Sequence, residues 1–376
     1  MDSFRILLGG DLFPSKNNVD LFTEGRSDEL FDEAIIELFK RADFSICNLE
    51  GTLTDSCEPI KKVDPIIKAP KEAIRGYSGL NLSCVTLANN HIADYGAVGF
   101  EDTIHVLEQS GIDYFGAGKK ADIKKYIEIN ANHKKVIIYT VAETMFNVPS
   151  ESMPGVNLYD GFETCDEIRK LRKECDYLVV IYHGGTEFFW YGSRLLRKRF
   201  HHMAESGANL VVAQHTHCIG MQEEYKGACL LYGQGDFLFA RRESPYREFG
   251  LLLELVVSDD GVKVSRHLIK HVDNHVIYDP EQDFTQFDER SHRLHSGDDF
   301  DEEYKDFASD GLLKFLEAFR GINRKDRYAK KIMSRERYRK YLLSRYTEKQ
   351  LLRIISCVQF EEYRESVIQG LWDTIR

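Results

Sequence analysis

The features of this sequence with the clearest chemical meaning are an amide beside a histidine and, further along, two histidines separated by one residue. The first pair is Asn90-His91, and the second is His215 and His217 in a His-Thr-His run. Amide oxygens and neutral imidazoles can bind transition metals, and a histidine that stays off the metal can donate a proton. The two motifs together predict a hydrolytic centre that holds two metal ions beside a proton donor.

Three further motifs offer carboxylates and an imidazole in comparable settings. Asp11 follows two glycines, Glu50 closes an Asn-Leu-Glu run, and His183 begins a His-Gly-Gly-Thr-Glu run that ends at Glu187. Glu50 can bridge two cations through its two oxygens, and Glu187 can orient a histidine or contact a substrate. Each residue taken alone is also an ordinary turn, cap or core residue. The mixed set of groups favours two divalent transition metals, Mn, Fe or Zn, over magnesium.

These residues follow short apolar runs that we predict to be buried strands. The runs span residues 4–8, 44–47, 83–87, 135–139, 177–182, 209–213 and 229–232. Between them lie amphipathic stretches with apolar residues at helical spacing, at residues 30–40, 100–110 and 194–205. Alternating strands and helices predict a layered α/β core. Because side chains at the carboxyl ends of neighbouring parallel strands converge in one crevice, we expect a single site.

Composition and charge restrict the class of protein. The 376 residues, 43% of them hydrophobic, predict a folded catalytic domain with a smaller appendage. The net charge of -11 argues against a nucleic-acid ligand, because phosphate backbones are bound by clustered Lys and Arg. No apolar run has the length of a signal peptide or a membrane helix, so we expect a cytoplasmic chain without a transmembrane segment. The eight cysteines lack Cys-x-x-Cys spacing and are expected to be buried free thiols.

The pattern changes towards the C-terminus. A hairpin-like alternation at 251–257 and 261–264 is predicted to close a catalytic domain at 1–275, followed by an acidic linker at 276–303. Residues 304–376 are rich in Lys, Arg, Glu and Leu at helical spacing and predict a helical C-terminal appendage. Its basic section, with interleaved tyrosines, is either a surface for an anionic polymer or membrane lipid or a solvated helix face, and the solvated face is favoured.

Taken in order, the motifs resemble those of the CapA family of bacterial capsule and poly-gamma-glutamate biosynthesis proteins, in the calcineurin-like metallophosphoesterase superfamily. The resemblance covers roughly residues 4 to 270. It rests on these motifs: Gly10-Asp11, Asn48-Leu49-Glu50, Ala88-Asn89-Asn90-His91 with Asp94-Tyr95-Gly96, His183-Gly184-Gly185-Thr186-Glu187, His215-Thr216-His217 and Tyr232-Gly233-Gln234-Gly235-Asp236-Phe237. The family implies a four-layer α/β/β/α sandwich, here with the helical appendage added.

The resemblance also implies roles for individual residues. One metal ion would be held by Asp11, Glu50 and His217. The other would be held by the following residues: Glu50, Asn90, His183 and His215. His91 would donate a proton or stabilise a phosphoryl oxygen, and Asp94 and Glu187 complete the predicted catalytic set.

The chain departs from the family pattern at three positions. Gln214 stands where the family usually has Gly, Gly184 where it has Trp, and Asp236 where it has Asn. None of these changes removes a predicted ligand. They bear on the preference for a substrate and leave metal binding as expected.

The residues and the resemblance lead to three hypotheses. The first is a metal-dependent hydrolase of capsule, exopolysaccharide or poly-gamma-glutamate biosynthesis, in which metal-activated hydroxide attacks a phosphate ester or related acyl bond. Its substrate would be an anionic polymer or a phosphate ester, and capsule-synthesis proteins would be its partners. The second is a non-catalytic polymer-binding or assembly factor, and the third is an amide hydrolase acting on a gamma-linked peptide. ATP-dependent ligation is disfavoured, because the sequence has no Gly-x-x-x-x-Gly-Lys loop.

Overall fold

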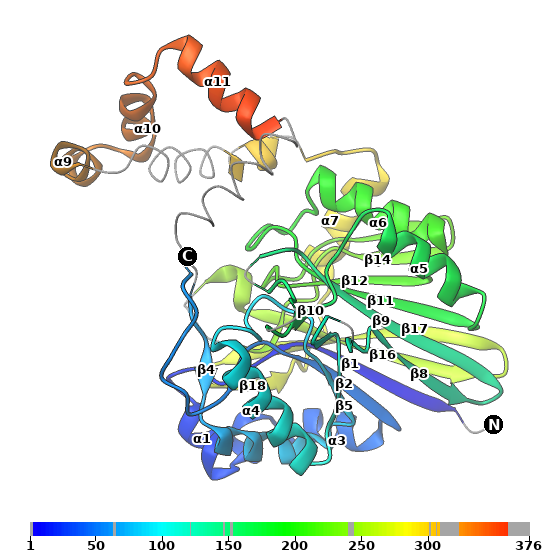
Figure 1. Cartoon of the computed structure of the whole chain (residues 1–376). Coiled ribbons are helices and arrows are strands. Elements are labelled where there is room, and N and C mark those ends of the chain that lie inside the picture. The colour runs from blue at the N-terminus through cyan, green and yellow to red at the C-terminus, as the bar shows by residue number, and fades with distance from the viewer. Residues whose placement is uncertain are drawn as a thin grey trace. The chain divides into compact units, whose positions relative to one another are not determined.

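The computed structural model of the chain contains two compact units, Met1–Asp299 and Phe300–Arg376. Figure 1 shows the chain coloured from the N-terminus to the C-terminus. The structure describes residues 3–62, 65–120, 122–145, 147–150, 153–239, 244–300, 302–305, 307–308 and 323–359.

An eight-stranded sheet forms one half of the first unit. Its strand order is β18-β17-β16-β1-β2-β5-β6, and β15 pairs with β1. The strands are β1 (Phe4–Leu12), β2 (Phe44–Leu49), β5 (Cys84–Thr86), β6 (Asp113–Phe115), β15 (Asp236–Leu238), β16 (Phe249–Ser258), β17 (Gly261–Val272) and β18 (His275–Tyr278). From β1 to β6 the strands run parallel, while β16, β17 and β18 run antiparallel. The parallel strands therefore direct their carboxyl ends to one edge of the sheet.

A six-stranded sheet forms the other half, in the order β13-β14-β12-β11-β9-β8. The strands are β8 (Tyr126–Ala131), β9 (Lys134–Ala142), β11 (Tyr177–His183), β12 (Leu210–Gln214), β13 (Gln222–Tyr225) and β14 (Ala228–Leu231). Its four central strands are parallel, and the two edge strands pair in the antiparallel direction. The central strands are almost entirely buried, which explains their continuous apolar runs.

The two sheets pack face to face and carry helices on their outer faces (Figure 1). Alternate residues of β1 separate the layers: Ile6 and Leu8 contact the second sheet, while Leu7 packs towards the helices. The helices outside the first sheet are α1 (Val19–Glu24), α2 (Ser27–Leu30), α3 (Glu33–Arg41), the 3-10 helix η1 (Lys71–Leu80) and α4 (Gly96–Gln109). Outside the second lie α5 (Glu163–Arg172) and α6 (Arg194–Ser206). The predicted four-layer α/β/β/α sandwich is confirmed.

Short elements complete the first unit. They are the pairs β3 (Thr52–Leu53) with β4 (Lys68–Ala69) and β7 (Ala117–Gly118) with β10 (Gly155–Val156), and the 3-10 helix η2 (Pro245–Arg247). Helix boundaries follow local chemistry, as in α6, where the Ser193 side chain accepts a hydrogen bond from Leu196 N and Gly207 ends the helix in a left-handed conformation.

The segment predicted to be an acidic linker has regular structure. It begins within β18 and contains α7 (Thr285–His295), and the first unit extends to Asp299. Phe287 of α7 is buried in the core between the sheets, and Ser291 Oγ accepts a hydrogen bond from Gln222 N at 2.8 Å. Two buried contacts on one helical face outweigh an acidic composition, so residues 285–295 belong to the sandwich rather than to a linker.

The second unit is helical where the structure describes it. Its helices are α9 (Arg324–Ile332), α10 (Arg335–Leu343) and α11 (Glu348–Gln359). Asp326 is fully buried, forms a capping box with Asn323, and accepts hydrogen bonds from Tyr341 and Arg345. The rest of the predicted appendage, at 309–322 and 360–376, lies outside the described residues.

Two further expectations concern membrane helices and thiols. Within the described part of the chain, no helix is both long enough and apolar enough to cross a bilayer. The described cysteines are free thiols, and four of them are buried: Cys47, Cys84, Cys165 and Cys218. Cys57 is exposed, contrary to the expectation of buried thiols, because it lies in an irregular polar segment after β3.

Candidate metal centre

The predicted ligands lie where strands of both sheets end. Asp11 pairs in register with Asn48 of β2 and with Asp236 of β15, and Glu50 follows β2 directly. From the second sheet, His183 is the last residue of β11, and His215 and His217 follow β12. The facing sheets therefore bring together residues separated by about half of the chain.

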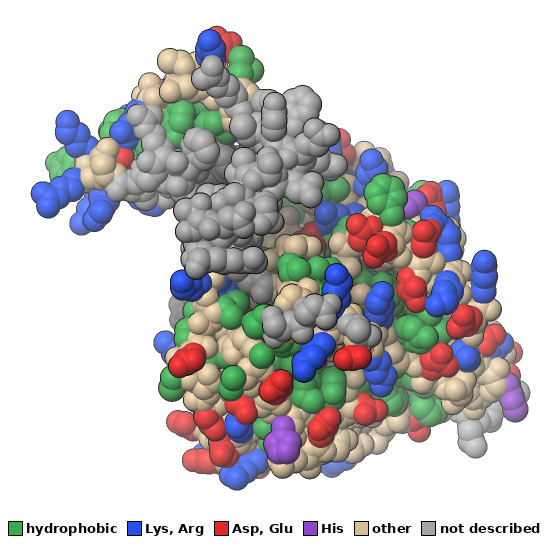
Figure 2. All heavy atoms as spheres, viewed as in Figure 1, with side chains coloured by type: hydrophobic (Ala, Val, Ile, Leu, Met, Phe, Trp, Pro, Cys, Tyr) green, Lys and Arg blue, Asp and Glu red, His purple; other side chains and the backbone are tan. Residues whose placement is uncertain are grey.

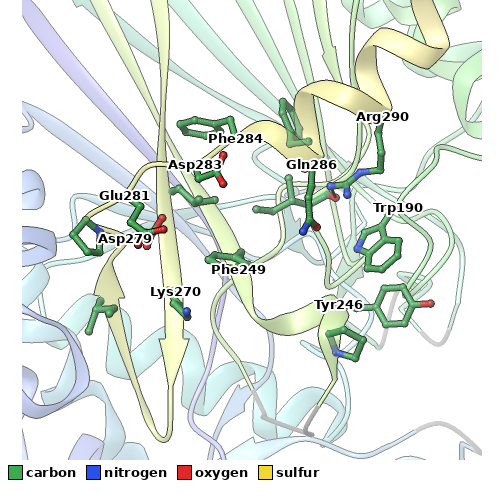
Figure 3. A pocket seen from close by; sticks show the side chains of 16 residues that line it. Trp190, Tyr246, Phe249, Lys270, Asp279, Glu281, Asp283, Phe284, Gln286 and Arg290 are labelled. Atoms are coloured by element: carbon green, nitrogen blue, oxygen red, sulfur yellow. Dashed lines mark hydrogen bonds between the residues drawn. The ribbon is translucent and has the colours of Figure 1, made fainter.

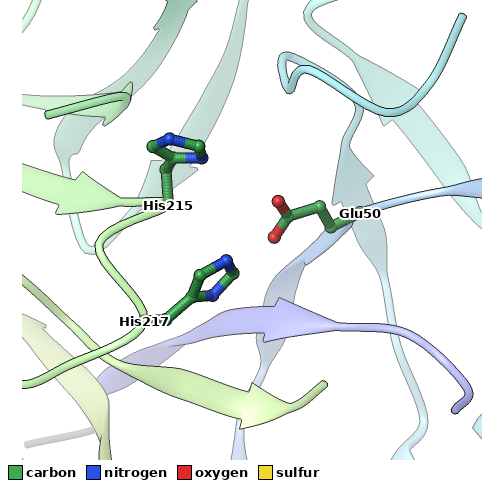
Figure 4. A group of neighbouring side chains, drawn as sticks. All are labelled: Glu50, His215 and His217. Carbon is green, nitrogen blue, oxygen red and sulfur yellow. The ribbon is translucent and has the colours of Figure 1, made fainter. Parts of the chain in front are cut away.

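Buried side chains face one another across this junction. Figure 4 shows Glu50 directed towards the rings of His215 and His217. The Nε2 atom of His183 lies 3.5 Å from Glu50 Oε1 and 2.9 Å from Asn90 Oδ1. Three groups have ligand atoms within 4.8 Å of one another: Glu50, His215 and His217; Asp11, His217 and Asp236; and Asp11, Glu50 and His183. All six predicted ligands are buried.

The donor set fits cations because it is incomplete without them. Both carboxylate oxygens of Glu50 and the Nδ1 atom of His215 are buried without a hydrogen-bond partner among the described residues. An unpaired buried carboxylate is unfavourable, and it survives in proteins chiefly where a counterion compensates it. Glu50 is a member of two of the three ligand groups, as expected for a residue shared between two metal ions.

Burial favours the uncharged forms of these groups, and a bound cation would offset that effect for the two carboxyls. Burial, reinforced by the charge of Glu50, raises the pKa of Asp11 to about 7. Burial also raises the pKa of Glu50. It lowers the pKa of His183 to about 4, and the pKa of His215 falls well below its usual value for the same reason. Neutral imidazoles are the forms that bind metal, so both histidines are ready ligands at neutral pH.

Asp236 is a further carboxylate in this centre that was not predicted as a site residue. Its Oδ1 lies 2.7 Å from His217 Nδ1, and its Oδ2 accepts a hydrogen bond from Arg247 Nη1 at 3.0 Å. Burial alone would raise the pKa of Asp236, but His217 and Arg247 outweigh it and hold that pKa at about 2. Burial would likewise lower the pKa of His217, but Asp236 outweighs it and raises that pKa to about 9. The Gly-Asp-Phe motif was the only sequence signal for Asp236.

These pKa values predict that metal affinity falls with decreasing pH. In the metal-free protein His217 holds a proton below pH about 9, and Asp11 holds one below about 7. Both protons must leave when a cation binds. We expect the apparent dissociation constant for Zn²⁺ to rise about tenfold per unit as pH falls from 9 to 7, and more steeply below 7. Competition with a chelator at fixed pH measures this dissociation constant. Asp236→Asn lowers the pKa of His217, so the dissociation constant of this variant should depend less on pH between 7 and 9.

The predicted proton donor sits in a second buried cluster beside these ligands. His91 Nδ1 lies 2.9 Å from Asp94 Oδ2, and the Ile67 amide donates to the same carboxylate oxygen at 2.7 Å. The structure thus brings two predicted catalytic residues together. Lys62, whose side chain is 1% exposed, is hydrogen-bonded to Asp94 and lies 3.2 Å from His91 Nδ1. Nothing in the sequence distinguishes Lys62 from a surface lysine.

Glu187 does not form the hydrogen bond to a histidine that was considered for it. Its side chain is 48% exposed, and its Oε1 lies 3.8 Å from His215 Nε2. Glu143 stabilises this loop instead. It accepts hydrogen bonds from the Gly185 amide at 3.1 Å, from Tyr182 Oη at 2.8 Å and from Arg199.

The same carboxylate leaves no room for a side chain at Gly184. A Cβ at Gly184 would lie 2.6 Å from Glu143 Cγ. We expect Gly184→Ala to lower the free energy of unfolding by about 1–3 kcal/mol, as overpacking does. Chemical denaturation of four proteins measures the coupling: parent, Gly184→Ala, Glu143→Ala and the double variant. If Gly184→Ala is as destabilising without Glu143 as with it, the contact is not its cause.

Gln214 also has a structural role. Its Nε2 donates to Gly9 O at 3.1 Å and to Gln234 Oε1 at 3.0 Å, which ties the end of β12 to β1. The amide therefore joins the two sheets just before the His-Thr-His run, at a position where a glycine offers no such bond.

A cleft of about 360 Å³ opens near the centre (Figure 3). Its lining includes Trp190 and Tyr246, whose ring centroids are 4.5 Å apart. Tyr246 packs against Phe188, which stacks on His217 with centroids 5.8 Å apart. Arg290 lies over Trp190 on the other side. One aromatic layer therefore separates this cleft from the predicted ligands.

Two facing sheets with outer helices, and a cluster of carboxylate, amide and imidazole groups at their strand ends, define a four-layer α/β/β/α protein with a candidate metal centre. The chain belongs to the family of bacterial capsule synthesis proteins described as PGA_cap, which matches residues 5–241. This confirms the family indicated by the motifs.

The sequence identity between this chain and individual relatives is low. The chain is 27% identical to the PGA biosynthesis protein CapA of Bacillus subtilis over 244 residues, 62% of this chain and 63% of that protein. It is 26% identical to the capsule biosynthesis protein CapA of Bacillus anthracis over 273 residues, 70% and 66% of the two chains. The chain thus spans slightly less than two thirds of these relatives.

Solved structures with a similar arrangement include a novel phosphatase from Mycoplasma pneumoniae. Its TM-score is 0.43 at 15% identity, covering 76% of this chain and 99% of that one. A hypothetical protein from Thermus thermophilus also has a TM-score of 0.43, at 14% identity, with 72% and 100% of the chains covered.

Proposed function

We propose that this protein is a metal-dependent hydrolase that cleaves a phosphate ester or a related acyl bond during the synthesis of a capsule polymer. The observation that carries the proposal is the buried carboxylate of Glu50, which has no hydrogen-bond partner among the described residues and lies among three histidines and a second carboxylate. The names of the Bacillus relatives support the process, and the set of candidate metal ligands supports the reaction class. Its substrate would be an anionic polymer or a phosphate ester, and capsule-synthesis proteins would be its partners.

Two divalent transition metals fit the donor set. Asp11, Glu50 and His217 would hold one of them. The second would be held by these residues: Glu50, Asn90, His183 and His215. Such ions, Mn, Fe or Zn, supply Lewis acidity and lower the pKa of water at the site. Asp236 orients His217 through their hydrogen bond, as carboxylates do for metal-binding histidines.

His91 would transfer a proton to the leaving group. Its Nδ1–H would donate to Asp94 Oδ2 at 2.9 Å, so Nε2 is the ring nitrogen that would exchange a proton with the leaving group. Asp94 and Lys62 are positioning residues, because they hold the imidazole without reaching the reacting atoms. Glu187, half exposed beside His215, is placed to meet the substrate, and the cleft beyond Phe188 has room for the adjoining part of a polymer.

Elemental analysis of the purified chain, followed by hydrolysis of generic phosphomonoesters and phosphodiesters after loading with Mn, Fe or Zn, tests the proposal. We expect two metal ions per chain and metal-dependent turnover. Two ions without turnover on phosphate esters or gamma-linked peptides would favour the alternative, a polymer-binding assembly factor. A Mycobacterium tuberculosis protein that is 26% identical over 210 residues, 52% of this chain and 55% of that one, is named a probable polyglutamine synthesis accessory protein, and this name supports the alternative. Absence of metal under every loading condition would overturn the proposal.

A further inference from the structure

The second unit carries a concentration of positive charge that the proposed function does not use. Residues 323–346 contain ten Lys and Arg side chains and two acidic ones, in a chain whose net charge is -11. Figure 2 shows Lys and Arg side chains gathered on the described part of this unit. The two acids are already paired: Asp326 accepts hydrogen bonds from Arg345 and Tyr341, and Glu336 pairs with Lys340. The ten cations and two acids give this segment a net charge of +8.

Helix α9 divides into a buried face and a cationic face. Asp326 and Ala329 are buried and point into the unit. The residues on the opposite face of the helix are exposed: Arg324, Lys325, Arg327, Tyr328, Lys331 and Ile332. Within the described part of the chain, none of the four cations in this set has a carboxylate partner.

Two large apolar side chains stand in the middle of these cations. Tyr328 is 67% exposed and Ile332 is 61% exposed, and they lie one helical turn apart. Exposed apolar patches rimmed by polar residues are typical of protein or membrane interaction sites. A helix face with apolar residues flanked by Lys and Arg is the arrangement that inserts shallowly at a membrane interface, with the cations reaching anionic headgroups.

We propose that this face, Arg324, Arg327, Tyr328, Lys331 and Ile332, docks the protein on a membrane surface rich in anionic phospholipid. A flexible polyanion would satisfy the cations, but it would leave Tyr328 and Ile332 exposed. The bilayer interface satisfies both. This inference is independent of the proposed hydrolase, because no residue of the metal centre takes part in it.

Co-sedimentation of the full chain with vesicles tests the inference. We expect binding to phosphatidylcholine vesicles that contain phosphatidylglycerol, little binding to phosphatidylcholine alone, and weakening as salt is added. Arg324→Glu with Lys331→Glu should weaken partitioning by at least about 25-fold, which is the effect of losing two cations. Tyr328→Ser with Ile332→Ser should weaken it by about tenfold.

Matched controls separate the surface from general effects of charge or apolarity. Lys119→Glu with Lys120→Glu changes the same charge on exposed residues of the first unit, and Leu352→Ser removes an exposed apolar side chain from α11. Both variants should bind vesicles like the parent. Binding to soluble polyglutamate that the charge variant loses and the apolar variant keeps, without vesicle binding, would assign the face to a polymer and overturn the inference. So would an absence of vesicle binding altogether.

Discussion

Glu50→Gln is expected to abolish metal binding and turnover together while making the metal-free protein more stable. Glu50 takes part in two of the three ligand groups, so its loss affects both predicted metal positions. A glutamine keeps the size of the side chain but cannot offer two anionic oxygens to two cations. Elemental analysis and turnover of the metal-loaded protein measure the first effect.

The opposite effect on stability follows from burial. A buried acid with a raised pKa destabilises the fold at any pH above its unfolded pKa, where the unfolded state is ionised. Removing that charge should raise the free energy of unfolding of the metal-free protein by about 1–3 kcal/mol, as measured by denaturation in the presence of a chelator. The control is Glu187→Gln, at a half-exposed carboxylate, which should leave metal content and stability unchanged. A Glu50 variant that still binds two ions would contradict its bridging role.

His91→Asn is expected to keep both metal ions and to lower kcat by about 10²- to 10⁴-fold, the usual contribution of a positioned acid or base. The asparagine retains a polar group near Asp94 but lacks the ring nitrogen Nε2 that would exchange a proton with the leaving group. Metal content, kcat and KM of the loaded variant separate this effect from a loss of ligands. Because the loss is confined to proton transfer, substrates with better leaving groups should recover part of the rate.

The matched control for that variant is His105→Asn. His105 is an exposed residue of α4, and its Nε2 is hydrogen-bonded to Gln109. It should behave like the parent in every measurement. If His91→Asn lost its metal ions, the residue would be acting as a ligand, and the assignment of a proton donor would fail.

The strand predictions were close because parallel strands buried on both faces are continuous apolar runs. The run at 4–8 became β1, which extends to Leu12 and so places Asp11 inside the strand instead of after it. Glycines at 9 and 10 hid this extension, since glycine usually marks a turn. A Cβ at Gly10 would collide with the carbonyl oxygen of Gly235, so the small residue serves close strand packing here.

The cluster around His91 could not be predicted as a whole. His91 and Asp94 lie in one motif, but Lys62 reaches them from an irregular segment about thirty residues earlier. Burial of a lysine depends on what surrounds it, and local composition carries no trace of that. Asp236 was overlooked for a similar reason, because its importance comes from pairing with His217 and Arg247 across the fold.

Features that depend on near neighbours along the chain could be predicted from the sequence: the alternation of buried strands and helices, the family, and the motifs that carry the predicted ligands. Tertiary structure alone decided which of these groups share a centre, which acids lack hydrogen-bond partners, and that residues 285–295 pack on the sandwich. The physical reason is the distance along the chain over which each kind of interaction acts. Periodicity and turn chemistry act over a few residues, whereas burial, desolvation and ligand geometry depend on the packing of one sheet against the other.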